Sequence, residues 1–179
     1  MTQADPARYS RRARVFHWLT FALVLAAYVT INLRKAFERG SDPRILMMES
    51  HFLFGIAVLL VVLPRLASRI GERAPPIVPP LSIWMQRAGD ATHLLLYAFL
   101  IVQPLLGIAT LQAEGRAIGL PLTEREIPHF LTLPGHWGHT LEAVHVWLGE
   151  AFYWVIGLHI LAALFHQLVR KDNTLRRMT

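Results

Sequence analysis

The sequence predicts an all-α integral membrane protein built as a four-transmembrane-helix bundle. Of the 179 residues, 54% belong to the hydrophobic set and 17% are charged. The apolar residues form long blocks rather than alternating stripes, which is typical of a chain that lies in a bilayer. Because lipid offers no hydrogen-bond partners to an open strand edge, we expect every span to be a helix.

Four apolar blocks are long enough, or nearly long enough, to cross the membrane, since a helical span needs about 20 mostly apolar residues. We expect these spans at residues 15–33, 46–63, 91–111 and 141–169. No internal repeat or soluble domain is visible, so residues 1–179 are expected to form one transmembrane domain.

Prolines and glycines mark the connections between the spans. The segment 74–80 reads Ala-Pro-Pro-Ile-Val-Pro-Pro and cannot continue a helix, because each proline removes a backbone donor and restricts the residue before it. The longest connection, 112–138, is also rich in glycine and proline, and we expect it to cap the outer face.

The distribution of basic residues predicts the topology. The net charge is +6 and the pI is near 10.5, but the basic residues flank the spans instead of gathering on one soluble face, so we expect no nucleic acid partner. With a cytoplasmic N-terminus, twelve basic residues lie inside: Arg8, Arg11, Arg12, Arg14, Arg65, Arg69, Arg73, Arg87, Arg170, Lys171, Arg176 and Arg177. Six lie outside: Arg34, Lys35, Arg39, Arg44, Arg116 and Arg125. By the positive-inside rule, both termini are expected in the cytoplasm.

The chain has no cysteine, and this limits the redox cofactors that it can hold. Disulfides, iron–sulfur clusters and the C-x-x-C-H attachment of c-type haem are all excluded. A redox cofactor would therefore have to be held non-covalently by ligands other than cysteine.

Histidines are the candidate ligands. Of the nine in the chain, five lie within or at the edges of the spans: His17, His51, His93, His145 and His159. Polar side chains are costly at membrane depth and usually functional there, although any one of them could simply hydrogen-bond a neighbouring helix.

The spacing on the fourth span favours the functional interpretation. His145 and His159 are 14 residues apart. On one helix they therefore lie within about 40° of the same face and about 21 Å apart along the axis. Two stacked metal sites need this arrangement, and it predicts two non-covalent b haems.

Each haem needs a second ligand from another helix. His51 begins the second span on the outer side and can face His145, whereas His17 begins the first span on the inner side and can face His159. His93 also begins a span from the inner side, and spacing alone does not separate it from His17.

The sequence does not decide the roles of the remaining four histidines and of two glycines. His166 shares the face of His159, but a haem there would collide with its neighbour, so headgroups, quinone or a propionate are its expected contacts. The outer-loop histidines His129, His136 and His139 have no carboxylate at ligand spacing, and we expect them to be solvated. Gly55 and Gly149, each four residues after a proposed outer ligand, would leave room for a flat macrocycle or pack against a helix.

The chain resembles the bacterial cytochrome b561 family, which is related to the b-type subunits of nickel hydrogenases and formate dehydrogenases. The resemblance covers nearly the whole length and is carried by residues 14–18, 48–51, 74–79, 145, 155–159 and 171–178. It implies that His17, His51, His145 and His159 are the axial ligands of two b haems, so it favours His17 over His93.

The resemblance also implies a function. Members of the family pass electrons between the periplasmic side of the bacterial inner membrane and the quinone pool. The tail and the proline segment look like those of the free-standing type, a superoxide oxidase that reduces ubiquinone and requires no protein partner. The alternative is an electron-transfer subunit docked to a periplasmic dehydrogenase or hydrogenase.

The first outer loop suits a small anionic donor. Arg34, Lys35, Arg39 and Arg44 stand there against Glu38 and Asp42. Such an excess of positive charge could steer superoxide to the outer haem, or it could meet phospholipid headgroups.

Overall fold

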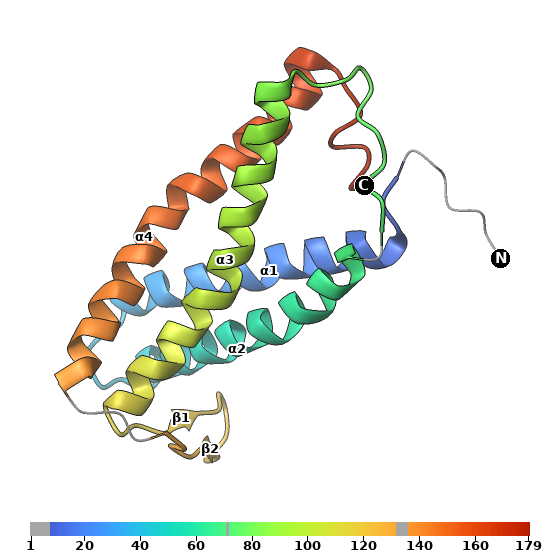
Figure 1. Ribbon diagram of the computed structural model, residues 1–179. Helices are drawn as coiled ribbons and strands as arrows, with labels where there is room; N and C mark the ends of the chain where they lie inside the picture. The colour runs from blue at the N-terminus through green and yellow to red at the C-terminus, as the bar shows by residue number, and fades with distance from the viewer. Residues whose placement is uncertain (1–7, 71, 132–135) are drawn as a thin grey trace.

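The computed structural model describes residues 8–70, 72–131 and 136–179, which are mostly helical. The long helices are α1 (Arg11–Leu33), α2 (Asp42–Ile70), α3 (Ile83–Ala113) and α4 (His136–Phe165). All four are long and apolar enough to cross a membrane, so the predicted four-helix membrane fold is confirmed (Figure 1). A 3-10 turn, η1 (Arg34–Ala36), extends α1, and a π-helical turn, η2 (His166–Arg170), extends α4.

The helices begin and end at clear local signals, and they run beyond the predicted spans. The side chains of Ser10 and Ser82 accept from the backbone N–H groups of Ala13 and Met85, which caps α1 and α3. Helices α2 and α3 extend beyond the predicted spans 46–63 and 91–111, because charged residues that end an apolar window still continue a helix at the membrane edge.

The loop after α3 contains two short strands that the sequence did not predict, β1 (Ile118–Gly119) and β2 (Glu126–Ile127). They pair antiparallel, with Ile118 opposite Ile127. Two residues per strand are too few to show the alternation by which a strand is recognised in a sequence. Residues 132–135 of this loop lie outside the described residues.

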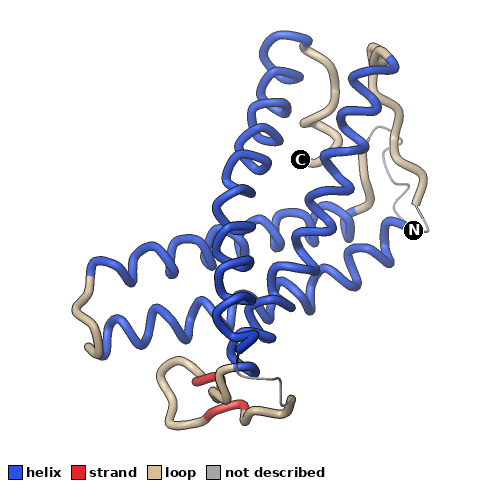
Figure 2. Tube along the Cα trace, turned by 60° about the vertical axis from the view of Figure 1, so that its left-hand side comes forward, coloured by secondary structure: helices blue, strands red, loops and turns tan. Residues whose placement is uncertain are grey.

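The four helices form two antiparallel pairs, α1 with α2 and α3 with α4, and the pairs cross each other (Figures 1 and 2). Helix α2 packs against both α1 and α3. The β-hairpin lies below the start of α2, at the end of the bundle that we call the hairpin end (Figure 1).

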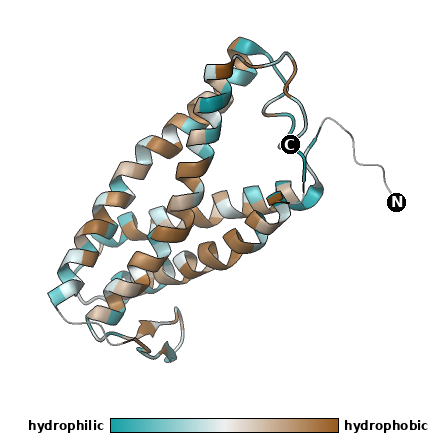
Figure 3. Cartoon of the chain, in the orientation of Figure 1, coloured by the Kyte–Doolittle hydropathy of each residue, from teal (hydrophilic) through white to brown (hydrophobic). Residues whose placement is uncertain are grey.

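Lipid, and not protein, must cover most of the apolar side chains. A small core of Val58, Val62 and Leu100 is buried between α2 and α3. By contrast, Leu60 is 64% exposed and Trp154 is 78% exposed, and apolar residues cover the outer surface of every long helix (Figure 3). A water-soluble protein does not show apolar surface on this scale, so the chain is a multi-pass membrane protein.

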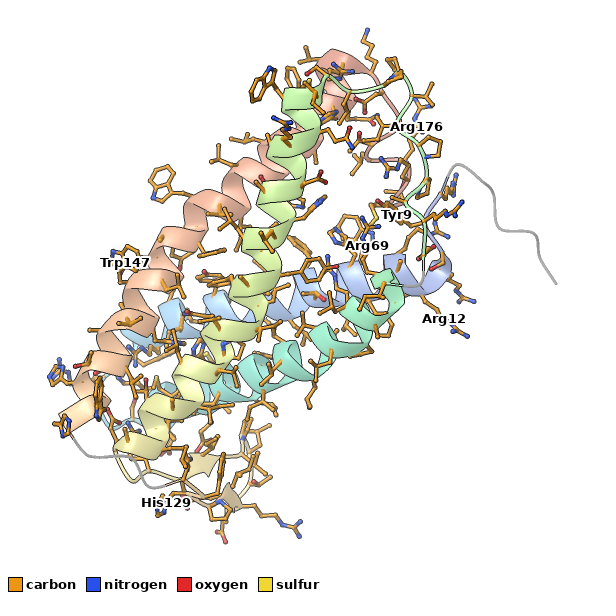
Figure 4. All side chains as sticks on the ribbon, viewed as in Figure 1. Tyr9, Arg12, Arg69, His129, Trp147 and Arg176 are labelled. Atoms are coloured by element: carbon orange, nitrogen blue, oxygen red, sulfur yellow. The ribbon has the colours of Figure 1, made fainter. Side chains whose placement is uncertain are left out.

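Opposite the hairpin end lies the tail end, where the C-terminal residues return to the start of α1. The backbone N–H of Tyr9 donates to Arg177 at 3.0 Å, and the indole N–H of Trp18 donates to the carbonyl of Met178 at 2.9 Å. Figure 4 shows Tyr9 close to Arg69 at this end, far from His129 at the hairpin end. The two ends of the bundle are therefore built differently.

Candidate functional site

Two of the predicted ligands face each other near the hairpin end. The imidazole of His51 on α2 and that of His145 on α4 have ring centroids 6.2 Å apart, and their planes are nearly perpendicular, at 80°. These residues are 94 positions apart in the chain, and the crossing of the two helix pairs brings them together.

The other two helices fix the orientation of both rings. Nδ1–H of His51 donates to the carbonyl oxygen of Ala27 on α1 at 2.9 Å, and Nδ1–H of His145 donates to that of Gln103 on α3 at 3.1 Å. A carbonyl oxygen can only accept, so Nδ1 carries the proton in both rings. The lone pair of each Nε2 is thereby left free to bind a metal.

This pair has the dimensions of a six-coordinate haem site. Two imidazoles that bind one iron atom through bonds of about 2 Å have ring centroids about 6 Å apart. Gly55 follows His51 by one helical turn, and a Cβ added there would meet nothing within 4 Å. The donor set and the open space next to it both fit a b-type haem.

Two further glycines make room for the His145 ring and for Gln103, which hydrogen-bonds to His145. A Cβ added at Gly107 on α3 would lie 3.1 Å from Cε1 of the His145 ring, so α3 can approach this closely only without a side chain. A Cβ at Gly149 would lie 3.0 Å from Nε2 of Gln103, which donates to the His145 carbonyl at 2.8 Å. Gly149 therefore makes room for Gln103, and of the two glycines that follow the proposed outer ligands by one turn, Gly55 is the one with open space at its Cβ position.

Nearer the tail end the structure brings three histidines together. The ring centroid of His159 on α4 lies 6.5 Å from that of His17 on α1 and 5.8 Å from that of His93 on α3. Nδ1 of His17 accepts a hydrogen bond from Nη2 of Arg65 at 3.0 Å. Both candidates for the second ligand of the inner site, His17 and His93, thus lie next to His159, and the centroid distances do not distinguish between them.

An aromatic pair separates the two histidine levels. Phe152 lies seven residues from both His145 and His159 on α4. Its ring stacks on that of Phe99 from α3, with centroids 3.9 Å apart and planes 12° apart, and both residues are buried. A buried aromatic pair therefore lies on α3 and α4 between the two histidine levels.

The four basic residues expected to guide superoxide differ in exposure and in their hydrogen-bond partners. Lys35 and Arg39 are exposed, whereas Arg34 is half-buried and donates to Sδ of Met48 at 2.7 Å. Arg44 donates to the carbonyl oxygen of Phe37 at 3.0 Å.

Arg44 also lines a groove of about 430 Å³ at the hairpin end. Arg116, on the loop after α3, lines the same groove, as do Glu49 and Glu126. Sequence reasoning missed Arg116 because it lies 72 residues away from Arg44 in the chain.

His166 has a protein partner, which the sequence had left open. Its Nδ1 lies 2.6 Å from Oδ2 of Asp172, and Nε of Arg170 lies 3.1 Å from the same oxygen. Burial opposes the charge of Asp172, which is 2% exposed, but hydrogen bonds from His166, Thr174 and Arg170 outweigh this effect. They hold the pKa of its carboxyl well below the usual range.

The remaining histidines stand at the hairpin end. His129 lies in the loop, and His136 and His139 begin α4; all three are exposed. Within residues 8–70, 72–131 and 136–179, no group of three or more His, Asp or Glu side chains is arranged to hold a bare metal ion.

Comparison with known proteins identifies the family. The family model described as prokaryotic cytochrome b561 matches residues 8–179. Cytochrome b561 homolog 1 of Escherichia coli K12 is 33% identical over 174 residues, which cover 96% of both chains. A probable superoxide oxidase CybB of Yersinia pestis is 37% identical over 174 residues, covering 96% of this chain and 95% of that one. The chain therefore belongs to the prokaryotic cytochrome b561 family, the members of which bind b-type haem and transfer electrons in the membrane.

Proposed function

We propose that this protein holds two b haems and transfers electrons from superoxide, on the periplasmic side, to ubiquinone. His51 and His145 would bind the outer haem, and His17 and His159 the inner one. Each haem, when bound, supplies reversible one-electron iron chemistry. The observation that carries this proposal is the His51–His145 pair, in which both Nδ1 atoms donate to backbone carbonyls and the ring centroids are 6.2 Å apart.

His17 is preferred to His93 for the inner haem on two grounds. The resemblance to the family implies a ligand on the first span. In addition, His17 is half-buried whereas His93 is exposed, and a shielded imidazole holds iron better against exchange with other ligands. Because α1 and α4 would then share the inner haem as α2 and α4 share the outer one, the cofactors would tie both helix pairs together.

The proposed substrate fits the charge of the hairpin end. The first loop carries Arg34, Lys35, Arg39 and Arg44 against Glu38 and Asp42. Arg116, from the next outer loop, adds a further positive charge at the groove that Arg44 lines. An anion as small as superoxide needs no shaped pocket, so an excess of positive charge near the outer site can guide its approach, and salt should weaken this effect.

The overall reaction balances without any other oxidant or reductant. Two superoxide anions each lose one electron and become dioxygen. The two electrons, together with two protons, convert ubiquinone to ubiquinol. A relative that is 37% identical bears the name of a probable superoxide oxidase, which supports the proposed donor.

The test uses the purified full-length protein in detergent. Its visible spectrum, oxidised and dithionite-reduced, should show low-spin b haem that acid–acetone extracts from the polypeptide, at about two haems per chain. Enzymatically generated superoxide should then reduce a soluble ubiquinone, and superoxide dismutase should abolish that reduction. Haem that accepts no electron from superoxide, with a dehydrogenase or hydrogenase copurifying, would establish the docked electron-transfer subunit instead.

A further inference from the structure

Arg65 on α2 is a cation at the inner histidine cluster, two residues beyond the predicted span 46–63. Its Nη2 lies 3.0 Å from Nδ1 of His17, and its Cζ lies 5.3 Å from the ring centroid of Tyr97 on α3. The residue is half-buried and stands one and a half turns before the end of α2. The guanidinium therefore points into the bundle between α1 and α3.

This charge has no carboxylate partner in the part of the chain that the structure describes. The ion pairs there join Arg116 to Glu114, and His166 and Arg170 to Asp172. A guanidinium that is half-buried between helices is costly unless an anion compensates it, and the face of a tyrosine ring compensates only part of the charge. The position of Arg65 therefore calls for an anion that is not a side chain.

Coordination of iron by His17 would change the contact that Arg65 now makes. Arginine can only donate, so the present hydrogen bond requires Nδ1 of His17 to be the acceptor. If Nε2 of His17 binds iron, Nδ1 carries the ring proton and becomes a donor. Nη2 of Arg65 and Nδ1 of His17, which are 3.0 Å apart, would then both be donors. Arg65 would therefore have to turn to another group that can accept its hydrogen bond.

We infer that Arg65 binds a propionate of the inner haem. This inference rests on the proposed function, since it presupposes a haem held by His17 and His159. A haem enters with two carboxylates of its own, and the planar guanidinium fork matches a carboxylate with two parallel hydrogen bonds. Arg65 is thereby assigned as a cofactor-binding residue, with its charge compensated only in the loaded protein.

Arg69 provides a matched control on the same helix. It stands one turn after Arg65, and its Cζ lies 5.0 Å from the ring centroid of Tyr9, a ring that Arg177 also covers at 5.0 Å. Substitution of either arginine by Gln removes one positive charge from the same part of α2. Only Arg65 contacts a proposed haem ligand.

The experiment measures haem content and the midpoint potentials of both haems in Arg65→Gln, Arg65→Lys and Arg69→Gln, purified in detergent. We expect Arg65→Gln to hold the inner haem about ten- to hundredfold more weakly, with the outer haem retained as evidence of folding. Any inner haem that remains should have a lower potential, because a lost cation favours the ferric state. Arg65→Lys should restore part of both properties, since it keeps the charge without the fork.

The possible outcomes are distinct. If Arg65→Gln leaves the inner haem with the content and potential of Arg69→Gln, Arg65 meets a lipid headgroup or packs on Tyr97, and the inference is overturned. If Arg65→Gln loses both haems, Arg65→Lys decides: an inner potential below that of wild type supports the inference, and an unchanged one overturns it. A wild-type protein without an inner haem would overturn the proposed function and this inference together, whereas an unaltered inner haem in Arg65→Gln overturns the inference alone.

Discussion

His51 and His145 lie on different helix pairs, yet their ring centroids are 6.2 Å apart. Carbonyl oxygens of Ala27 and Gln103 accept from their Nδ1 atoms, so all four helices take part in orienting one pair of rings. Such hydrogen bonds to the second ring nitrogen are typical of metal-binding histidines, because they fix the tautomer and raise the basicity of the ligand.

This pairing predicts that His51→Ala and His145→Ala each remove the same haem. The iron of a bis-histidine site becomes five-coordinate when either ligand is lost, and one ligand holds it weakly in a pocket built for two. Haem content should fall from about two to about one per chain in each single variant and no further in the double variant. His139→Ala, which alters an exposed histidine on the same helix as His145, should keep both haems. Loss of different haems in the two single variants would contradict the pairing.

The inner site predicts a different outcome for three histidines. His17→Ala and His159→Ala should each remove the inner haem and leave the outer one, since the two levels are about 21 Å apart along α4. His93→Ala should keep both haems, although its ring lies 5.8 Å from that of His159. Extracted haem and the reduced α-band of each variant provide the measurement. If His93→Ala loses a haem and His17→Ala keeps both, the inner pairing is wrong.

Much of this arrangement could be predicted from the sequence, because it depends on helical periodicity. The 14-residue spacing from His145 to His159 places both on one face of one helix whatever the tertiary structure. Alternation of the four spans across the membrane then puts His51 and His17 at opposite ends. The fold class and the meeting of these residues follow from those two facts.

Other features depend on side-chain contacts between distant segments, which periodicity does not encode. The Arg65–His17 hydrogen bond and the exchange of hydrogen bonds between Gln103 and His145 join different helices. Each of these contacts joins the two helices of one antiparallel pair, and the packing within that pair sets which side chains meet. The role proposed for Gly149 illustrates the limit, since the space at that position is taken by Gln103 and only structure reveals this.

Gly55 predicts a steric test of the outer site. The Cβ position of Gly55 is open, and on the proposed function the macrocycle occupies this space. Gly55→Leu should therefore weaken retention of the outer haem by about 1–3 kcal/mol, or about 5- to 160-fold, as for other overpacking substitutions. Gly89→Leu is the control, since its Cβ position on α3 is equally open but lies far from His51 in sequence and near the start of its helix. Equal haem content in the two variants would place the macrocycle elsewhere.

The topology is open to a direct test. The distribution of twelve basic residues against six predicts that Thr179 lies in the cytoplasm, and the return of the tail to Tyr9 places residue 9 on the same side. An alkaline phosphatase fusion at Thr179 should be inactive and a fluorescent-protein fusion there should be bright. A fusion in the loop at residue 122, which is 88% exposed, should give the opposite result. An active phosphatase at Thr179 would exchange the inner and outer assignments.

Asp172 predicts a pH-dependent contribution to stability at the tail end. Its carboxylate accepts from Arg170 and Thr174 and pairs with His166, and replacement by Asn leaves the cation of Arg170 without an anion. Breaking such a buried pair costs about 3 kcal/mol, so Asp172→Asn should unfold at a lower temperature at pH 7, whereas the exposed Asp90→Asn should not.

The direction of the pH effect follows from the lowered pKa of Asp172. A carboxyl with a lower pKa in the folded protein stabilises the fold fully above the pKa of the unfolded chain, 3.8, and loses this contribution as pH falls towards the folded value. The difference in Tm between wild type and Asp172→Asn should therefore be constant from pH 5 to pH 7 and shrink below about pH 4. Circular dichroism of both proteins in detergent, melted across this range, measures it. A difference that grows on acidification would mean that the carboxylate destabilises the tail, contrary to the contacts seen with Arg170 and Thr174.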